Sequence, residues 1–356
     1  MDAIYEILAE KLDKLGKGFP RTESGAEYNV LQNRFSPQDA EYAVELSGHE
    51  WELPGDLAAR MGKDADTVAA DLYDMSYRAL IYRMRRDDKV YYRVMPMMLG
   101  LMELQLNKGS KDPEYLQNMG AFIGGGLGDA LVGGETPPLR FIPVNHSLVN
   151  DNKVLNTDDA VAILNKADRI SVMPCICRQM AGHCDYMEPP FETCLAFDDW
   201  ADFFVENGDA RYIAREEAIN IQRSAEEKGF LTLTANSEDA KTMCSCCSCC
   251  CGIIAMMNVF NNTSRKLAGN YYCEKDDKLC SNCGICATRC TMRAHFEVQG
   301  VYEYDDERCV GCGLCISTCA PKALTLKIKS DEELAYLPKT PYEMFEIAAS
   351  ERRSED

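Results

Sequence analysis

Two stretches near the C-terminal end of the chain repeat one cysteine spacing, C-x-x-C-x-x-C-x-x-x-C. The first covers residues 280–290 and the second covers residues 309–319. They belong to a chain of 356 residues with 19 cysteines, of which 15 lie between Cys244 and Cys319. Such a density of cysteine is typical of either a disulfide scaffold or a set of metal sites.

A disulfide scaffold suits short secreted chains, whereas this chain is long and its number of cysteines is odd. The first residues, MDAIYE, lack the basic start and the apolar segment of a signal peptide. No apolar run reaches the roughly 18 residues that a membrane helix needs. We therefore expect a cytoplasmic protein without a membrane span, in which the thiols stay reduced and serve as ligands.

The spacing of the two repeats favours iron–sulfur clusters over zinc. Three closely spaced cysteines on a tight loop can surround part of one cubane, and the small residues between them let backbone N–H groups approach the sulfur atoms. Structural zinc sites instead prefer separated pairs of ligands, with four ligands for each ion.

Residues 271–329, with these two motifs, resemble a bacterial-type ferredoxin domain that binds two [4Fe-4S] clusters. The sequence departs from that pattern after the last cysteine of each motif, where Thr291 follows Cys290 and Pro321 comes one residue late. In such domains the fourth cysteine of each motif binds the other cluster. The resemblance implies that the first cluster is bound by Cys280, Cys283, Cys286 and Cys319, and the second by Cys309, Cys312, Cys315 and Cys290. We also expect a β-hairpin at residues 295–304, around Gln299-Gly300.

Eleven cysteines lie outside the two motifs, and most of them form two groups in the sequence. We interpret them as ligands of one or two further iron–sulfur clusters. The expected ligands of the first set are Cys175, Cys177, Cys184 and Cys194, and those of the second set are Cys246, Cys247, Cys249 and Cys250. A zinc site that uses His183 and buried thiols without a metal remain alternatives, and Cys273 stands alone.

The order C-I-C-R, G-H-C, E-T-C-L-A-F and C-S-C-C-S-C-C-C-G, followed by two ferredoxin motifs, is similar to a family of multi-domain 4Fe-4S binding proteins from anaerobic bacteria. The similarity covers most of residues 35–328. It implies redox electron transfer and does not imply a particular substrate.

Residues 1–108 contain no cysteine, and their pattern predicts a winged-helix-like domain. Helices are expected at residues 37–46, 54–61 and 64–80, followed by a hairpin at residues 82–94. The third helix would enter DNA in such a fold, but it carries four aspartates before its first arginine, Arg78. Acidic side chains repel phosphates, so this domain is expected to contact protein, including a second copy of the chain in a homodimer, more readily than DNA.

The expected fold class is α+β with several domains. A cysteine-rich α+β domain spans residues 109–270, the ferredoxin-like domain spans residues 271–329, and residues 330–356 form a charged surface helix or tail. Only four histidines occur, and none belongs to a known hydrolase or metalloprotease motif, so no catalytic residue is assigned.

These features favour an iron–sulfur protein that relays low-potential electrons between protein partners, such as a reductase and a terminal oxidoreductase. The net charge of -19 argues against binding to nucleic acid and offers an acidic docking surface for a basic partner. Two alternatives remain open: a redox-sensing winged-helix regulator, and an oxidoreductase subunit whose central cluster is catalytic.

Overall fold

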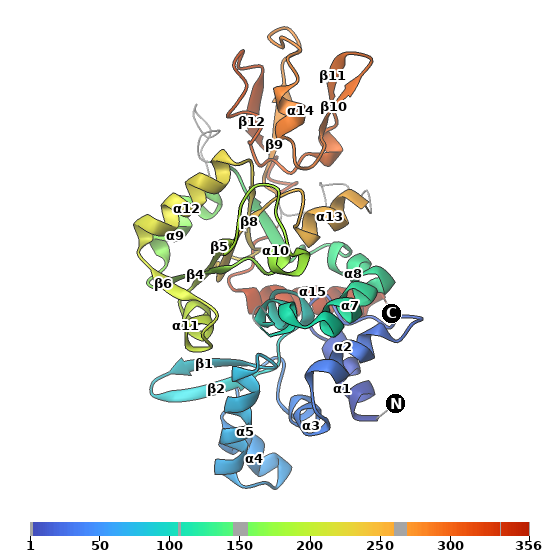
Figure 1. The fold of residues 1–356 in the computed structure, drawn as a ribbon, viewed down its shortest axis with the longest axis vertical. Helices are drawn as coiled ribbons and strands as arrows, with labels where there is room; N and C mark the ends of the chain where they lie inside the picture. Colours follow the sequence, from blue (N-terminus) through green and yellow to red (C-terminus); the bar gives the residue numbers. More distant parts are fainter. Residues whose placement is uncertain (1–2, 106–107, 145–155, 260–268, 335, 356) are drawn as a thin grey trace. The chain divides into compact units, whose positions relative to one another are not determined.

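The chain divides into two compact units in the computed structural model, which describes residues 3–105, 108–144, 156–259, 269–334 and 336–355 (Figure 1). The first unit comprises Met1–Gly134, Asp202–Ala210 and Tyr342–Asp356, and the second comprises Glu135–Ala201 and Arg211–Pro341. Helices occur together with several separate sheets, a mixed composition that is compatible with the expected α+β class. The more specific domain architecture stays a prediction.

The first unit consists mainly of helices. Its helices are α1 (Ala3–Asp13), α2 (Ala26–Arg34), α3 (Pro37–Glu45), α4 (Pro54–Met61), α5 (Ala65–Tyr77), α6 (Met102–Leu104), α7 (Pro113–Phe122) and α8 (Gly128–Val132), with α15 (Pro341–Glu355) at the C-terminal end. Strands β1 (Tyr82–Arg86) and β2 (Lys89–Arg93) form an antiparallel hairpin. Helix α11 (Asp199–Glu206) contributes residues to both units.

The helix starts in the first unit follow from their sequence signals. Ser36 caps α3 in a capping box, because its hydroxyl accepts from the backbone N–H of Asp39 and the Asp39 carboxylate accepts from the backbone N–H of Ser36. Proline occupies the first turn of both α3 and α4, where no backbone N–H is needed. The three predicted helices and the predicted hairpin are therefore present, although α5 is shorter than expected.

The C-terminal residues of the chain belong to the first unit. Four apolar side chains of α15 are buried there, namely Met344, Phe345, Ala348 and Ala349. His49 Nδ1 lies 2.7 Å from Glu346 Oε1, close enough for a hydrogen bond or an ion pair. The ring of Tyr342 packs edge-on against the ring of Trp51. The segment predicted as a charged surface helix or tail thus includes a helix, and part of that helix is packed against the first unit.

The second unit is built around a six-stranded antiparallel sheet with the order β3-β7-β8-β5-β4-β6. Its strands are β3 (Leu139–Ile142), β4 (Ile170–Pro174), β5 (Glu192–Phe197), β6 (Arg211–Ile213), β7 (Leu231–Ala235) and β8 (Thr242–Cys246). Its longer helices are α9 (Ala160–Lys166), α10 (Ile176–Ala181), α12 (Arg215–Glu227) and α13 (Gly252–Val259).

The two faces of this sheet differ. Leu195 of β5 and Met243 of β8 pack in one apolar cluster with Leu164 of α9 and Ala218 of α12, and Figure 1 shows both helices beside the sheet. Side chains alternate between faces along a strand. Cys194 and Cys244, the neighbours of Leu195 and Met243, therefore lie on the face away from these helices.

The part of the second unit that carries the two cysteine motifs has two short antiparallel sheets. One pairs β9 (Tyr271–Lys275) with β12 (Leu324–Ile328), and the other pairs β10 (His295–Val298) with β11 (Val301–Tyr304). The short helix α14 (Ile285–Arg289) carries Cys286. The hairpin predicted around Gln299-Gly300 is confirmed.

Candidate metal centre

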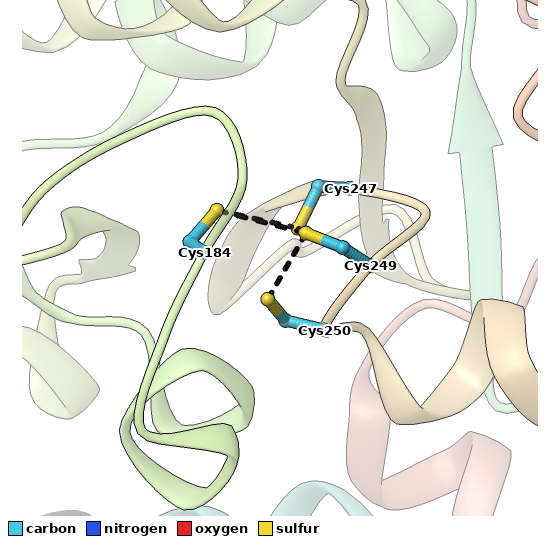
Figure 2. A group of neighbouring side chains, drawn as sticks. All are labelled: Cys184, Cys247, Cys249 and Cys250. Carbon is cyan, nitrogen blue, oxygen red and sulfur yellow. Dashed lines mark hydrogen bonds between the residues drawn. The ribbon is translucent and has the colours of Figure 1, made fainter.

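Four cysteines meet between two loops of the second unit, and we call them the four-thiol site: Cys184, Cys247, Cys249 and Cys250. Cys184 lies in the loop after α10, and the other three lie in the turn between β8 and α13. Figure 2 shows the Cys184 side chain pointing toward the other three. The four Sγ atoms all lie within 4.8 Å of one another.

The spacing of these sulfur atoms suits metal coordination. Cys184 Sγ is 3.9 Å from Cys247 Sγ and 3.8 Å from Cys249 Sγ, and Cys249 Sγ is 3.5 Å from Cys247 Sγ and 3.1 Å from Cys250 Sγ. Metal–thiolate bonds of about 2.3 Å place tetrahedral ligands about 3.8 Å apart. The four-thiol site can therefore hold a metal with little movement of its side chains.

A buried arginine, Arg178 of α10, lies against the four-thiol site. Its Nε donates to Cys184 Sγ at 3.4 Å, and its two terminal nitrogens donate to Thr193 Oγ1 at 2.6 Å and to the Ser245 carbonyl at 2.9 Å. The guanidinium also lies 4.6 Å from the centre of the Phe230 ring. Within the described residues, these contacts include no carboxylate.

The buried charge of Arg178 needs an anion, because an unpaired buried charge is strongly unfavourable. The side chain is 1% exposed, so water does not supply this compensation. Burial alone would lower the pKa of Arg178, but the neighbouring thiols of Cys175, Cys247 and Cys184 raise it. The anionic partner of Arg178 is therefore thiolate, the form of cysteine that binds metals.

Cys184 is the thiol most clearly prepared for ionisation in the four-thiol site. Burial raises its pKa, but the backbone N–H of Tyr186, the Arg178 guanidinium and the Cys249 thiol lower it to about 7. A large fraction of Cys184 is therefore thiolate near neutral pH, even without a metal.

The structure groups the central cysteines differently from the sequence interpretation. Cys184 was expected with Cys175, Cys177 and Cys194, but it lies with the turn cysteines instead. Cys246 is the one member of the second expected set that does not belong to the four-thiol site. Its thiol interacts instead with Cys244 and Cys251, which were in neither expected set. His183 is exposed and its Nδ1 pairs with the Ala181 carbonyl at 3.0 Å.

The four expected ligands of the first ferredoxin cluster line one pocket. Cys280, Cys283 and Cys286 of the first motif surround it together with Cys319 of the second motif. Leu324 and Pro321 form part of the same wall. The last cysteine of the second motif thus lies with the first motif.

The expected ligands of the second cluster also lie near one another. Burial and the neighbouring thiols of Cys315, Cys290 and Cys309 raise the pKa of Cys312 well above its usual value. Backbone N–H groups point at two of these sulfur atoms, from Ala294 to Cys290 at 3.2 Å and from Gly311 to Cys309 at 3.4 Å. Such N–H···S bonds are one of the means by which proteins set cluster potentials.

A further group beside the second motif consists of Cys273, His295 and Cys315, whose ligand atoms lie within 4.8 Å of one another. All three residues are buried, and Cys315 Sγ is 3.9 Å from Cys273 Sγ. Burial and Lys275 lower the pKa of His295 to about 4, so its ring is neutral at pH 7. The sequence signals for this group were weak, because Cys273 and His295 lie in different strands and belong to no spaced motif.

Comparisons with known proteins give no relative for this chain. No protein family matches it, no curated protein matches it, and no solved structure matches it. Across the described residues, no helix is both long enough and apolar enough to cross a bilayer.

Proposed function

We propose that this chain is an iron–sulfur protein that relays low-potential electrons between protein redox partners through two ferredoxin-type [4Fe-4S] clusters and further central metal sites. The first cluster would be held by Cys280, Cys283, Cys286 and Cys319. The second would be held by Cys309, Cys312, Cys315 and Cys290.

The observation that carries this proposal is the exchange of the last cysteine between the two motifs. Cys319 is the last cysteine of the second motif but lines the pocket of the first, and Cys290 is the last cysteine of the first motif but interacts with Cys312 of the second. This exchange is characteristic of two-cluster ferredoxins, in which it holds both clusters within one small domain. Two separate zinc sites would not require it.

The central thiols support an extended relay. The four-thiol site and Arg178 occupy the same unit of the fold as the ferredoxin motifs. Residues of this unit can hold several metal centres, exclude water from them and donate hydrogen bonds to their sulfur atoms. These are the factors that a protein uses to adjust redox potential.

The acidic surplus of the chain supports docking to basic partners. The charge of -19 favours fast association with a basic reductase or oxidoreductase, and added salt should slow such association. The competing regulator proposal loses support in the first unit, because Arg83 and Arg85 of the hairpin both pair with Glu206, at 3.0 and 2.8 Å. The single carboxylate of Glu206 thus compensates part of the positive charge of these two arginines.

An EPR-monitored redox titration of the anaerobically purified full chain tests this function. We expect two low-potential signals that appear on reduction with dithionite and interact magnetically, because the two clusters share one small domain. Cys283→Ser should remove or alter the first signal, and Cys312→Ser the second. The matched control is Ser317→Ala, an exposed position between two ligands of the second motif whose hydroxyl bonds only the Leu314 carbonyl in the described contacts.

The proposal is contradicted if reduction produces no cluster signal in the wild-type chain. It is also contradicted if both cysteine variants keep the full wild-type spectrum, because the assigned residues would then not be ligands.

A further inference from the structure

Six central cysteines outside the four-thiol site form a second group. Four segments supply them: Cys175 and Cys177 at the start of α10, Cys194 in β5, Cys244 and Cys246 in β8, and Cys251 just before α13. We call this group the six-thiol ring. Cys246 and Cys251 are buried, and the other four are half-buried.

Interactions between thiols connect the six residues in a closed order. Cys175 interacts with Cys177, and Cys177 interacts with Cys251. Cys251 interacts with Cys246, and Cys246 interacts with Cys244. Cys244 interacts with Cys194, which in turn lies close enough to Cys175 and Cys177 for electrostatic interaction.

The sheet fixes three members of the ring on one face. Leu195 pairs with Met243 and Ala196 with Thr242, a register that places Cys194 opposite Cys244. Cys244 and Cys246 are two residues apart in β8 and therefore point to the same side. Ser245, between them, points to the other side, where its hydroxyl donates to Gln222 of α12 at 3.4 Å.

The composition of the ring identifies the class of its ligand. Thiolates are soft ligands that select zinc, copper(I) or iron–sulfur clusters. A single tetrahedral ion accepts four of them, so six exceed the need of one ion. The ring is also wider than the four-thiol site, because among the described residues its six sulfur atoms do not form a group within 4.8 Å of one another.

A buried cation lies beside the ring. Arg178 donates to the Ser245 carbonyl at 2.9 Å, between Cys244 and Cys246 in β8, and to Cys184 Sγ of the four-thiol site at 3.4 Å. Its guanidinium therefore lies next to both groups of thiols, where a positive charge favours thiolate ligands.

We propose that the six-thiol ring binds one polynuclear iron–sulfur cluster of at least four irons, separate from the metal of the four-thiol site. The choice of iron rests on the proposed function, and the location of the site rests on the ring itself. The ring deepens that function by assigning the central cluster to Cys175, Cys177, Cys194, Cys244, Cys246 and Cys251.

The test compares iron, copper, zinc and acid-labile sulfide per chain in the anaerobically purified full-length protein and its variants. Cys244→Ser/Cys246→Ser removes the two ring thiols of β8, and Cys177→Ser/Cys251→Ser removes one from α10 and one from just before α13. Each should lose at least four irons and a similar number of sulfides while the ferredoxin EPR signals remain. Ser245→Ala, in the same strand but on the other face, should keep the wild-type content.

Unchanged iron and sulfide in both ring variants, with the ferredoxin signals intact, would overturn the ring while the proposed function stands. Loss of one metal ion without sulfide, or of copper, would also overturn it. If the wild-type chain lacks ferredoxin signals but both ring variants lose iron and sulfide, the proposed function fails and the ring stands. Cys184→Ser/Cys249→Ser, in the four-thiol site, should leave the ring cluster in place. Loss of the ring cluster in this variant would contradict the claim that the ring and the four-thiol site hold separate metal centres.

Discussion

Replacing Arg178 tests the electrostatic role of the most deeply buried cation near the central thiols. Arg178→Gln removes the positive charge and keeps a side chain that can donate to Thr193 Oγ1 or the Ser245 carbonyl. Arg178→Lys keeps the charge and removes the planar fork that reaches three partners at once. We expect the glutamine variant to bind metal at the four-thiol site far more weakly and the lysine variant to lie between it and wild type.

The size of this effect follows from the contact of Arg178 with Cys184. With the Nε–Sγ distance at 3.4 Å, the centre of the guanidinium charge lies about 5 Å from the charge of the metal–thiolate group. At an effective dielectric constant of about 20, Coulomb attraction at that distance is about 3 kcal/mol. Each 1.36 kcal/mol corresponds to about a tenfold change in an equilibrium constant. The predicted loss of metal affinity is therefore roughly a hundredfold, at the upper end of the 10–100-fold effects found for residues that support metal ligands.

The assay is an anaerobic titration of the holoprotein with a chromophoric chelator, followed by measurement of the metal that each chain retains. The metal that belongs to the four-thiol site is the difference in retained metal between wild type and Cys184→Ser/Cys249→Ser. Far-UV circular dichroism and the ferredoxin EPR signals report whether each variant is folded. A glutamine variant that is folded and holds this metal within about threefold of wild type would refute the electrostatic reasoning.

Two further predictions concern the first unit and the second ferredoxin motif. Asp39 bonds Arg78 through both carboxylate oxygens and caps α3, so Asp39→Asn should lower the free energy of unfolding by about 2 kcal/mol at pH 7 in urea denaturation. Burial raises the Asp39 pKa, but Arg78 and Ser36 lower it below its usual value. The stabilisation by the Asp39 carboxylate is therefore present above about pH 4 and is lost as pH falls through the folded pKa. A stability difference between Asp39→Asn and wild type that persists at lower pH would contradict this reasoning. Gly311→Ala would bring a Cβ to 2.1 Å from the Tyr271 carbonyl oxygen, at a φ of +67°, and should reduce the iron content of the second ferredoxin cluster; a wild-type iron content would show that the loop can shift freely.

Local signals in the sequence were sufficient for many elements of the fold. Ser36 with Pro37 marked the start of α3, Pro54 marked the start of α4, and Gln299-Gly300 marked the hairpin of β10 and β11. These features depend on backbone preferences within a few residues of chain. The interaction of Glu206 with Arg83 could not be predicted in this way, because the two residues are 123 positions apart.

The central site was predicted by residue type but not by grouping. Adjacent cysteines in the β8–α13 turn point in different directions, so Cys247 joins the four-thiol site while Cys246 and Cys251 join the ring. The alternation of side chains along a strand was an available signal that Cys244 and Cys246 share a face. Which distant loop supplies Cys184 depends on the tertiary arrangement of α10 against this turn, and no local pattern contains that information.

The most direct test of the central proposal is the iron and acid-labile sulfide content of the anaerobically purified full-length chain. Two ferredoxin cubanes require about eight irons, and the ring cluster raises the total to at least about twelve, with a similar number of sulfides. We predict at least twelve irons in each chain. A reproducible value of eight irons would contradict the proposal of a central cluster. A value well below eight irons, with all thiols reduced, would contradict the assignment of the chain as a multi-cluster electron-transfer protein.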